Sequence, residues 1–448
     1  MRPPSLGACL RISVLALLSM HAVASFMAAA SAQEGWPMAG RDAAHSGTAA
    51  GPAPPYRVAW ERQVGGGGPA TGVAVTDEAV VAVTREGVLA LDPADGEVLW
   101  ERGRSPGSAG VPAISGDLVL HARSEGVSGQ VAARDLASGD LVWQATLGST
   151  PAGGPTVAGN TAIVGTGQGE VVALDLADGE VAWRYRTAGG VAGPPAVADG
   201  VVVASSYRGS SGESTVYGLD LAGGEEGPLW QLSPGAVGPP SAPAIGESLA
   251  YVGISDLNVR AVDLAEGSEV WTSRSRDGFG PRQVPVAGEA LVLADRTHVY
   301  RLDPENGEEL WTFRLADLLA VGEGRVNTLL ASSPAISGRT VLLGSGDGML
   351  SGIDLDSGHR VWRRDLGSGP VGPVAVAGER IYAVTLGEGG SVVALEHDPA
   401  GRLLDEVSPT VLFVDRALLN FAAAAAGVAA ALLLLFRFAL RPRSGEGA

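Results

Sequence analysis

The sequence predicts an all-β fold, an eight-bladed β-propeller with tryptophan-docking repeats, plus one C-terminal transmembrane helix. Tryptophans recur at intervals of 40 to 51 residues, and a constant period of this length is typical of repeat folds. The chain combines 65 glycines and 28 prolines with 46% hydrophobic residues, which favours short strands joined by tight turns. An apolar stretch near the C-terminus predicts the helix. The repeated tryptophans are Trp60, Trp100, Trp143, Trp183, Trp230, Trp271, Trp311 and Trp362.

The N-terminus is expected to be a secretory signal peptide, residues 1–32. Arg2 and Arg11 make its start basic, residues 12–27 are mostly apolar, and Ala30-Ser31-Ala32 is a small-x-small cleavage signal. An uncleaved N-terminal anchor is the alternative. Residues 33–56 are interpreted as a lead-in to the propeller.

The propeller is predicted to span residues 57–408, and one interval between tryptophans shows its unit. Short runs rich in β-branched residues are separated by turns that contain Gly, Asp or Asn, which indicates strands and hairpins. Four short antiparallel strands in about 40 residues form one propeller blade. The four strands are expected at residues 153–158, 161–166, 170–175 and 180–185.

One spacing recurs in the third and fourth strands: an aspartate, a glycine four residues later, and a tryptophan after four more. The glycine allows a positive φ in the hairpin, the aspartate accepts hydrogen bonds from turn amides, and the tryptophan fills the wedge between blades. We therefore interpret these aspartates as turn stabilisers rather than catalytic groups or metal ligands. The copies begin at Asp92, Asp135, Asp175, Asp263, Asp303 and Asp354, and the copy from Asp220 to Trp230 has two extra residues.

This motif resembles that of the quinoprotein, or PQQ-like, β-propeller repeat family. The family pattern is Ala-x-Asp, a short turn ending in Gly, and then Trp, as in Ala90-Leu91-Asp92 through Trp100 and in Ala173-Leu174-Asp175 through Trp183. The resemblance covers roughly residues 57–408 and implies the propeller fold. In outline the chain is also similar to the propellers of outer-membrane assembly, although a C-terminal anchor departs from that pattern.

Quinoprotein dehydrogenases of the family hold PQQ over a disulfide between adjacent cysteines, beside a Ca²⁺ ion bound by acidic and amide side chains. The only cysteine here is Cys9, in the expected signal peptide, and no residue set matches the calcium ligands. The resemblance therefore implies the fold without the cofactor, and neither PQQ nor Ca²⁺ is expected.

The two ends of the repeat region complement each other. The strand that contains Trp60 has no three strands before it, while residues 371–396 supply three strands whose continuation, residues 402–405, lacks a tryptophan. We expect the Trp60 strand to complete the last blade, because closing the ring leaves only short, protected edges. The alternative is that residues 402–407 form that blade's own fourth strand.

A transmembrane helix is predicted at residues 417–436, because a 20-residue stretch that is apolar except at Asn420, at 1.5 Å for each residue, matches the hydrocarbon core of a bilayer. Arg437, Arg441 and Arg443 follow at once, which places the tail, residues 437–448, in the cytoplasm. The chain is thus expected to be a single-pass membrane protein with its propeller outside the cytoplasm.

The formal net charge of −18 argues against nucleic acid as a partner, since phosphate binding needs clustered cations. The basic residues are all arginine, which excludes Schiff-base and P-loop lysines. The histidines are scattered without ligand spacing, and no hydrolase or metalloprotease motif occurs. No catalytic, cofactor-binding or metal-binding residue is therefore assigned.

Function is expected on the loops that break the period, because binding residues tend to lie on long loops of a rigid scaffold. Residues 123–130 and 206–215 lengthen two loops within blades, and the inter-blade loops at residues 273–283 and 315–332 carry arginines. The alternative interpretation is that these charged loop residues are ordinary solvated surface residues with no role in binding. The candidate partner-binding residues are Arg274, Arg276, Arg282, Arg325 and Asn327.

The sequence favours a membrane-anchored, extracytoplasmic, non-enzymatic propeller that binds an unknown protein or ligand of the cell envelope. A PQQ-dependent dehydrogenase-like enzyme or a quinone or ligand sensor is the first alternative. Carbohydrate or cell-wall binding is the second, although the repeated tryptophans are expected to be buried rather than free to stack on sugars.

Overall fold

The computed structural model describes residues 35–403 except 65–69, 85–86, 104–106, 210–211, 236–237, 255, 277–285, 289, 296, 315–331, 368 and 388. The expected signal peptide, the predicted transmembrane helix at residues 417–436 and the tail at residues 437–448 lie outside the described residues. Within the described part of the chain, no helix has the length and hydropathy needed to cross a bilayer.

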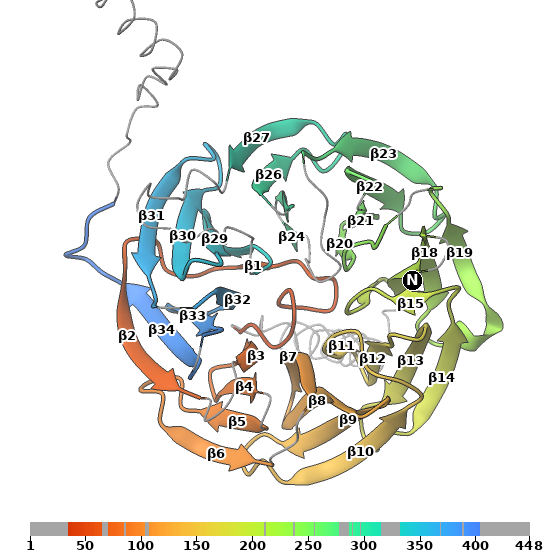
Figure 1. Cartoon of the computed structure of the whole chain (residues 1–448), viewed down its shortest axis with the longest axis horizontal. Helices are drawn as coiled ribbons and strands as arrows, with labels where there is room; N and C mark the ends of the chain where they lie inside the picture. The colour runs from red at the N-terminus through yellow and green to blue at the C-terminus, as the bar shows by residue number, and fades with distance from the viewer. Residues whose placement is uncertain are drawn as a thin grey trace, which may run out of the picture. The chain divides into compact units, whose positions relative to one another are not determined.

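Eight β-sheets surround one axis, each forming a blade whose successive strands run from the axis outward (Figure 1). This confirms the predicted eight-bladed, all-β propeller. Blade 1 consists of β3 (Ala70–Val75), β4 (Val80–Thr84), β5 (Val88–Leu91) and β6 (Val98–Arg102), and blade 2 of β7 (Ser108–Ser115), β8 (Leu118–Glu125), β9 (Ser128–Asp135) and β10 (Leu141–Leu147). Blade 3 consists of β11 (Thr156–Ala158), β12 (Thr161–Gly165), β13 (Glu170–Asp175) and β14 (Val181–Arg186). Blade 4 consists of β15 (Gly190–Val191), β16 (Ala196–Ala198), β17 (Val201–Arg208), β18 (Glu213–Asp220) and β19 (Pro228–Leu232).

The remaining blades follow the same order around the ring. Blade 5 consists of β20 (Ala244–Gly246), β21 (Leu249–Ile254), β22 (Asn258–Asp263) and β23 (Glu269–Arg274), and blade 6 of β24 (Val286–Ala287), β25 (Leu291–Ala294), β26 (His298–Leu302) and β27 (Glu309–Arg314). Blade 7 consists of β28 (Ala335–Ser337), β29 (Thr340–Gly344), β30 (Met349–Asp354) and β31 (Arg360–Asp365). Blade 8 consists of β32 (Val371–Ala377), β33 (Arg380–Thr385), β34 (Ser391–His397) and β2 (Tyr56–Gln63). A short 3-10 helix, η1 (Gly224–Glu226), lies in the outer hairpin of blade 4.

The ring closes through its two ends, as expected. Strand β2 lies antiparallel to β34, with Trp60 opposite Ala394, and supplies the outermost strand of blade 8. That place is therefore taken by the N-terminal strand, and the alternative fourth strand at residues 402–407 is wrong for this position. Because β2 belongs to a sheet whose other strands come from the C-terminal end, the ring is complete only when both ends have folded.

The middle strands are apolar because each blade is covered by a neighbour on both faces. Every residue of β4 and of β29 is buried, as expected for a short continuous apolar run in a sheet covered on both sides. The buried side chains group into clusters that span adjacent blades, and the largest of these joins blades 7, 8 and 1 across the closure. The core therefore lies between blades rather than on the axis.

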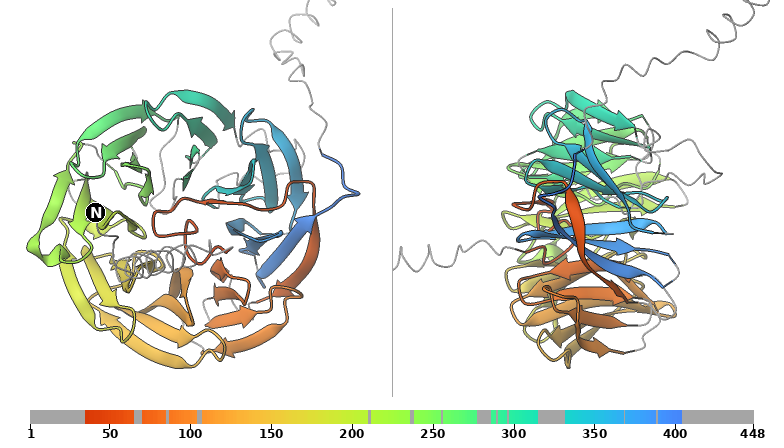
Figure 2. Two further views of the ribbon diagram at one scale, coloured as in Figure 1. Left: turned by 180° about the vertical axis from the view of Figure 1, so that it is seen from behind. Right: turned by 90° about the vertical axis from the view of Figure 1, so that its left-hand side faces the viewer.

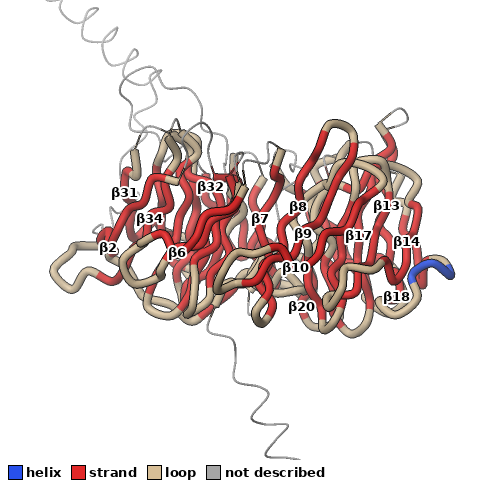
Figure 3. The backbone as a smooth tube through the Cα atoms, turned by 90° about the horizontal axis from the view of Figure 1, so that it is seen from below, coloured by secondary structure: helices blue, strands red, loops and turns tan. Residues whose placement is uncertain are grey.

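The ring has two different faces. The hairpin face carries the turns between the first and second strands and between the third and fourth strands of each blade. The loop face carries the turns between the second and third strands together with the loops that join blades. Figure 3 shows the ring edge-on, with η1, which belongs to a third-to-fourth-strand turn, at one edge.

The lead-in crosses the axis at the hairpin face, and we call residues 36–52 the axial segment (Figure 1, Figure 2). It pairs with the innermost strands of several blades near their C-terminal ends, including a two-residue parallel ladder of β1 (Thr48–Ala49) with β28. Its carbonyl groups accept hydrogen bonds as follows: Trp36 from Val75 at 2.8 Å, Pro37 from Ile114 at 2.7 Å, Ala43 from Val197 at 2.6 Å, Ala44 from Ile245 at 2.8 Å and Gly47 from Ile336 at 2.8 Å.

Candidate functional site

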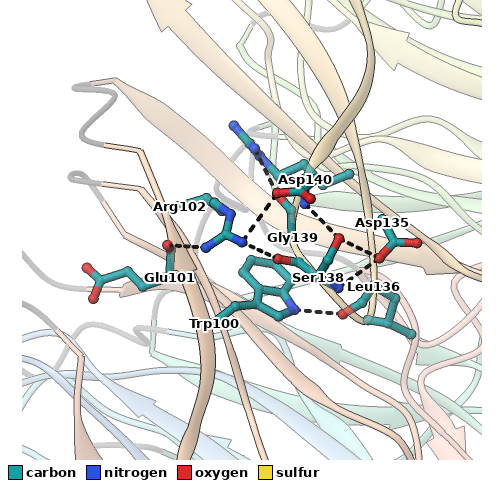
Figure 4. A network of polar contacts seen from close by, with 9 residues as sticks. Trp100, Glu101, Arg102, Asp135, Leu136, Ser138, Gly139 and Asp140 are labelled. Carbon is teal, nitrogen blue, oxygen red and sulfur yellow. Dashed lines mark hydrogen bonds and ion pairs between the residues drawn. The ribbon is translucent and has the colours of Figure 1, made fainter.

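Each blade junction is built by the repeated motif, and Figure 4 shows the one between blades 1 and 2. The Trp100 indole N–H donates to the Leu136 carbonyl oxygen at 2.7 Å, and one Asp135 carboxylate oxygen accepts from the Ser138 amide and hydroxyl at 2.7 Å each. These two hydrogen bonds hold the pKa of Asp135 below its usual range. The interpretation of this aspartate as a turn stabiliser is confirmed.

Gly139 has a second role that the spacing alone did not predict. Its φ of +74° lies in the region that favours glycine, and a Cβ atom at this position would lie 2.5 Å from Cε3 of Trp100. The glycine therefore also leaves room for the indole of the preceding blade to dock. The ring face of each tryptophan from Trp60 to Trp311 covers the motif glycine of the next blade in the same way.

Seven junctions share the indole hydrogen bond, and the eighth differs. In each, the indole N–H of the tryptophan donates to a backbone carbonyl oxygen of the next blade at 2.7 to 3.0 Å. The pairs are Trp60–Pro93, Trp100–Leu136, Trp143–Leu176, Trp183–Leu221, Trp230–Leu264, Trp271–Pro304 and Trp311–Leu355. Trp362 instead packs edge-on against Tyr56, with ring centroids 4.9 Å apart. The Tyr56 hydroxyl donates to Pro52 at 3.0 Å, so the closing junction is joined to the axial segment.

The outermost strands are poor edges for strand addition. The residue before each repeated tryptophan interrupts the ladder as a β-bulge, for example Leu99, which lies between the pairs Leu91–Val98 and Ala90–Trp100. Bulges turn an edge away from further pairing and re-aim a side chain, here the tryptophan. Partner recognition is therefore expected on the faces of the ring rather than along its outer edge.

The outermost strands also separate charge along the axis. In blades 1 to 6 the hairpin before the tryptophan carries acidic residues and no arginine, as in Asp95 and Glu97 or Asp178 and Glu180. Toward their other ends these strands carry Arg184, Arg186, Arg274 and Arg314, whereas Arg62 and Arg102 donate back to the hairpin carbonyls of Gly96 and Ser138 in the next blade. The hairpins of blades 1 to 6 are thus acidic, and Arg62 and Arg102 offset part of that charge from the preceding blade.

Two of the predicted binding residues lie at the loop end of blade 5. Arg274 is exposed at the last position of β23, and Arg276 follows in the inter-blade loop. Arg276 donates through Nη2 to both Glu309 oxygens at 2.9 and 3.2 Å, which ties this loop to blade 6. Arg282, Arg325 and Asn327 lie outside the described residues, so whether all five gather stays a prediction.

A buried carboxylate holds the loop of Arg276 in place. Asp295, with no exposed surface, accepts from the backbone amides of Thr297 at 2.8 Å and His298 at 2.6 Å, and from the Tyr300 hydroxyl. The Arg276 amide in turn donates to the Tyr300 oxygen at 2.8 Å. Burial and the adjacent Asp295 raise the pKa of Tyr300, which keeps this hydroxyl neutral and able to donate.

The two lengthened segments within blades are strands rather than loops. Strands β8, β9, β17 and β18 are each eight residues long, whereas β12 and β13 of the intervening blade 3 have five and six. The extra residues extend the β8–β9 and β17–β18 hairpins toward the loop face on either side of blade 3 (Figure 3). Their alternating polar residues could have indicated strand extension.

A polar cavity of about 470 Å³ opens on the loop face at blade 8. Its walls are Glu61 and Gln63 of β2, Thr385 and Ser391 around the turn between β33 and β34, and several glycines. The Ser391 amide and Thr385 hydroxyl already bond each other at 2.8 Å. The cavity therefore marks a concave, glycine-lined part of the same face and contains no cluster of ionisable groups.

The described residues do not fit a quinone and calcium pair. Among them, no three His, Cys, Asp or Glu side chains gather where they could hold a metal ion. The axial segment crosses the ring axis at the hairpin face (Figure 1), and its His45 has no exposed surface. No reaction step through such a cofactor is derived for this chain.

A family model and the curated relatives agree on one family. The family described as outer membrane protein assembly factor BamB matches residues 56–129, 127–289 and 295–404. The BamB of Yersinia pestis is 26% identical over 164 residues, which cover 35% of this chain and 40% of that protein. The BamB of Escherichia coli (strain K12) is 32% identical over 99 residues, covering 22% of this chain and 24% of that protein. The chain spans less than half the length of these curated relatives.

Solved structures with low sequence identity show the same fold. The crystal structure of BamB from Moraxella catarrhalis has a TM-score of 0.59 at 18% identity and covers 78% of this chain and all of that chain. The quinohemoprotein alcohol dehydrogenase from Comamonas testosteroni has a TM-score of 0.65 at 15% identity, covering 86% of this chain and 84% of that chain. A BamB and an alcohol dehydrogenase thus share this ring, so fold likeness alone does not separate binding proteins from enzymes.

Proposed function

We propose that this chain, which belongs to the family of the outer membrane protein assembly factor BamB, is a non-enzymatic scaffold that binds a protein of the cell envelope. The proposal includes an extracytoplasmic propeller held at the membrane by the helix expected at residues 417–436. It also carries over to this chain the role in outer-membrane assembly that the relatives' name states. The family match supports the scaffold, and the apolar stretch followed by arginines supports the anchor.

One observation carries the choice of the binding face. The axial segment lies across the hairpin face, and β34 ends at His397 on that same face, so both ends of the described ring leave from it. The loop face is free of them and carries the arginines, the extended hairpins and the polar cavity.

The test is crosslinking in intact membranes from matched positions. A photoreactive residue replaces Gln168, an exposed residue in the β12–β13 turn on the loop face, or Glu180, in the hairpin of the same blade. The proposal expects one discrete protein adduct from position 168 and none from position 180. Adducts from position 180 alone would overturn the choice of face, and no adduct from positions on either face would overturn the scaffold function.

The enzyme alternative has a test of its own. Purified protein is mixed with PQQ and Ca²⁺, and quinone binding and dye-linked alcohol oxidation are measured. The scaffold proposal expects neither. Saturable quinone binding together with oxidation would replace the scaffold with a dehydrogenase, whatever the crosslinking shows.

A further inference from the structure

We infer that the polar cavity at the loop end of blade 8 receives a basic side chain of the partner protein, arginine in preference to lysine, with Glu61 as its counter-charge. The inference rests on the proposed scaffold function and names the chemistry of one contact with the partner. We call this cavity of about 470 Å³ the blade 8 pocket.

The blade 8 pocket lies on the side of β2 that faces blade 7. The side chains of Trp60 and Arg62 donate to carbonyl groups of blade 1 on the other side of the strand, at 3.0 and 2.7 Å. Because side chains alternate along a strand, Glu61 and Gln63 point away from blade 1. There they line the pocket together with residues of the loop that joins β31 to β32.

Three polar side chains of the pocket have no partner among the described residues. The Glu61 carboxylate and the Gln63 amide are exposed and make no hydrogen bond or ion pair there. Ser391 lies opposite Gln63 in the ladder of β2 and β34, so the two side chains share one side of the sheet. Ser391 is 8% exposed, and its hydroxyl is unpaired although its backbone amide donates to Thr385. All three groups are therefore available to a ligand.

Glycines shape the other walls of the pocket. A Cβ atom at Gly369 would lie 2.4 Å from Cα of Gly387, so the inter-blade loop and the β33–β34 turn approach this closely only because they lack side chains here. Gly389 has a φ of +74°, and a Cβ atom there would lie 2.2 Å from Nε2 of Gln63. Side chains at these positions would displace the Gln63 amide or separate the two loops, so the glycines keep the pocket as it is.

The carboxylate of the pocket is not neutralised by the arginines nearest to it in the sequence. Arg62 donates to the Gly96 carbonyl at 2.7 Å, and Arg364 donates to the Tyr56 carbonyl at 3.3 Å. Among the described lining residues Glu61 is the one ionisable group. The pocket therefore presents one net negative charge to a ligand.

This lining selects a cation that carries N–H donors. An anion would meet an uncompensated carboxylate. A metal ion would find a single carboxylate, and no three potential ligands from His, Cys, Asp and Glu gather among the described residues. A sugar would find no aromatic side chain to stack on among the lining residues. The remaining class is a basic side chain.

Arginine fits these groups better than lysine does. Its planar guanidinium group has five N–H donors and can bind both oxygens of a carboxylate, whereas an ammonium group has three donors. Glu61 supplies two acceptor oxygens, and Gln63 and Ser391 supply one each. The cavity volume lies within the range of about 300–1,000 Å³ that is typical of ligand sites, which leaves room for the side chain and the partner's adjoining backbone.

The test compares Glu61→Gln with a matched control, Glu101→Gln. Glu101 follows the tryptophan of blade 1 as Glu61 follows that of blade 8, is also exposed, and does not line the pocket (Figure 4). The probes are blocked peptides with one arginine, lysine or citrulline between glycines, and citrulline is the neutral counterpart of arginine. Saturation-transfer difference NMR measures their binding to the full chain and to both variants, and thermal unfolding verifies that each protein is folded.

The arginine peptide is expected to bind the parent chain and Glu101→Gln, and to bind Glu61→Gln about tenfold more weakly, because the hydrogen-bonded ion pair loses its charge. The lysine peptide is expected to bind more weakly than the arginine peptide, and the citrulline peptide is expected not to bind. Binding should also weaken in about 0.3 M salt, because exposed charges are screened there. If Glu61→Gln does not fold, Gln63→Ala is used and a smaller loss in the same direction is expected.

Equal binding of the arginine and citrulline peptides, or an equal loss in Glu101→Gln, would overturn the inference. In intact membranes Glu61→Gln is expected to reduce the adduct from position 168 about fivefold or more, whereas Glu101→Gln leaves it unchanged. If the arginine peptide binds through Glu61 but this adduct persists, the pocket is a site for a small cation and not a contact with the partner, while the scaffold function stands. Failure of the scaffold proposal is distinct, because it removes the adducts of the parent chain itself.

Discussion

The docking of each tryptophan on the next blade's glycine can be tested by a single methyl group. Gly179 has a φ of +75°, and a Cβ atom there would lie 2.4 Å from Cε3 of Trp143. Gly159, in the other hairpin of the same blade, has a φ of +58° with no atom within 4 Å of such a Cβ. The pair separates backbone strain from the contact with the indole.

Gly159→Ala is expected to cost about 1–2 kcal/mol of unfolding free energy, because an L-residue is strained in the left-handed region. Gly179→Ala carries the same strain plus overpacking against the indole, which adds about 1–3 kcal/mol. The expected total is about 2–5 kcal/mol. The difference between the losses of unfolding free energy in the two variants measures the cost of the clash with the docked indole.

Urea unfolding followed by tryptophan fluorescence and circular dichroism gives both free energies. In a Trp143→Ala background the excess cost of Gly179→Ala should vanish, since the methyl group then has space. Equal destabilisation by Gly159→Ala and Gly179→Ala in the parent chain would refute the docking account, and so would an excess cost that persists without Trp143.

Three further predictions concern the core, the closure and the loop face. His121 is buried, and burial together with the nearby Arg134 and Arg123 charges lowers its pKa to about 3. This folded-state pKa lies below the unfolded value of about 6.5, so the unfolded chain binds the proton first as the pH falls. The free energy of unfolding is therefore expected to decrease between about pH 6.5 and pH 3. His121→Gln is expected to flatten unfolding free energy against pH in that window, and an unchanged slope would contradict the assignment. Tyr56→Phe removes the hydroxyl bond to Pro52 and is expected to cost about 1 kcal/mol, measured by urea unfolding; a cost near zero would show that this bond does not support the closure. Arg276→Ala breaks an exposed pair with Glu309 and is expected to cost no more than about 1 kcal/mol, with the cost shrinking at high salt; a larger, salt-independent loss would give Arg276 a structural role beyond that pair.

The blades were predictable because the same side chains repeat where the same geometry is needed. The turn aspartates, the positive-φ glycines and the buried tryptophans are each required by local sterics or hydrogen bonding, so their spacing indicates strands and hairpins. The closure followed from strand counting, since Trp60 lacks a blade before it and the last three strands lack a fourth.

The axial segment was not predictable for a physical reason. Its backbone hydrogen bonds, such as Ile245 N–H to the Ala44 carbonyl at 2.8 Å, leave no mark on the sequence. Its apolar side chains Trp36 and Met38 are buried in the clusters between blades, but their residue types do not reveal which blades they contact. His45 is buried through a contact with the Pro243 carbonyl, at 2.7 Å and 198 positions away in the chain. No local pattern reports a pairing at that separation.

The candidate site was only partly predictable. Sequence indicates which loops are long and where arginines occur, but not which arginines are already engaged, as Arg276 is with Glu309. The heights of neighbouring loop-face hairpins also differ, since β8 and β9 have eight residues each and β12 and β13 have five and six. Those heights follow from strand length and pairing register, which the repeat period does not specify.

The central claim is that this ring is a scaffold whose loop face meets a protein partner. Crosslinking from positions 168 and 180 of blade 3, in cells that produce the full chain, tests it most directly, because the two positions share a blade and differ in face. The account predicts a single discrete adduct from position 168 and none from position 180. An adduct from position 180 with none from any loop-face position would contradict it.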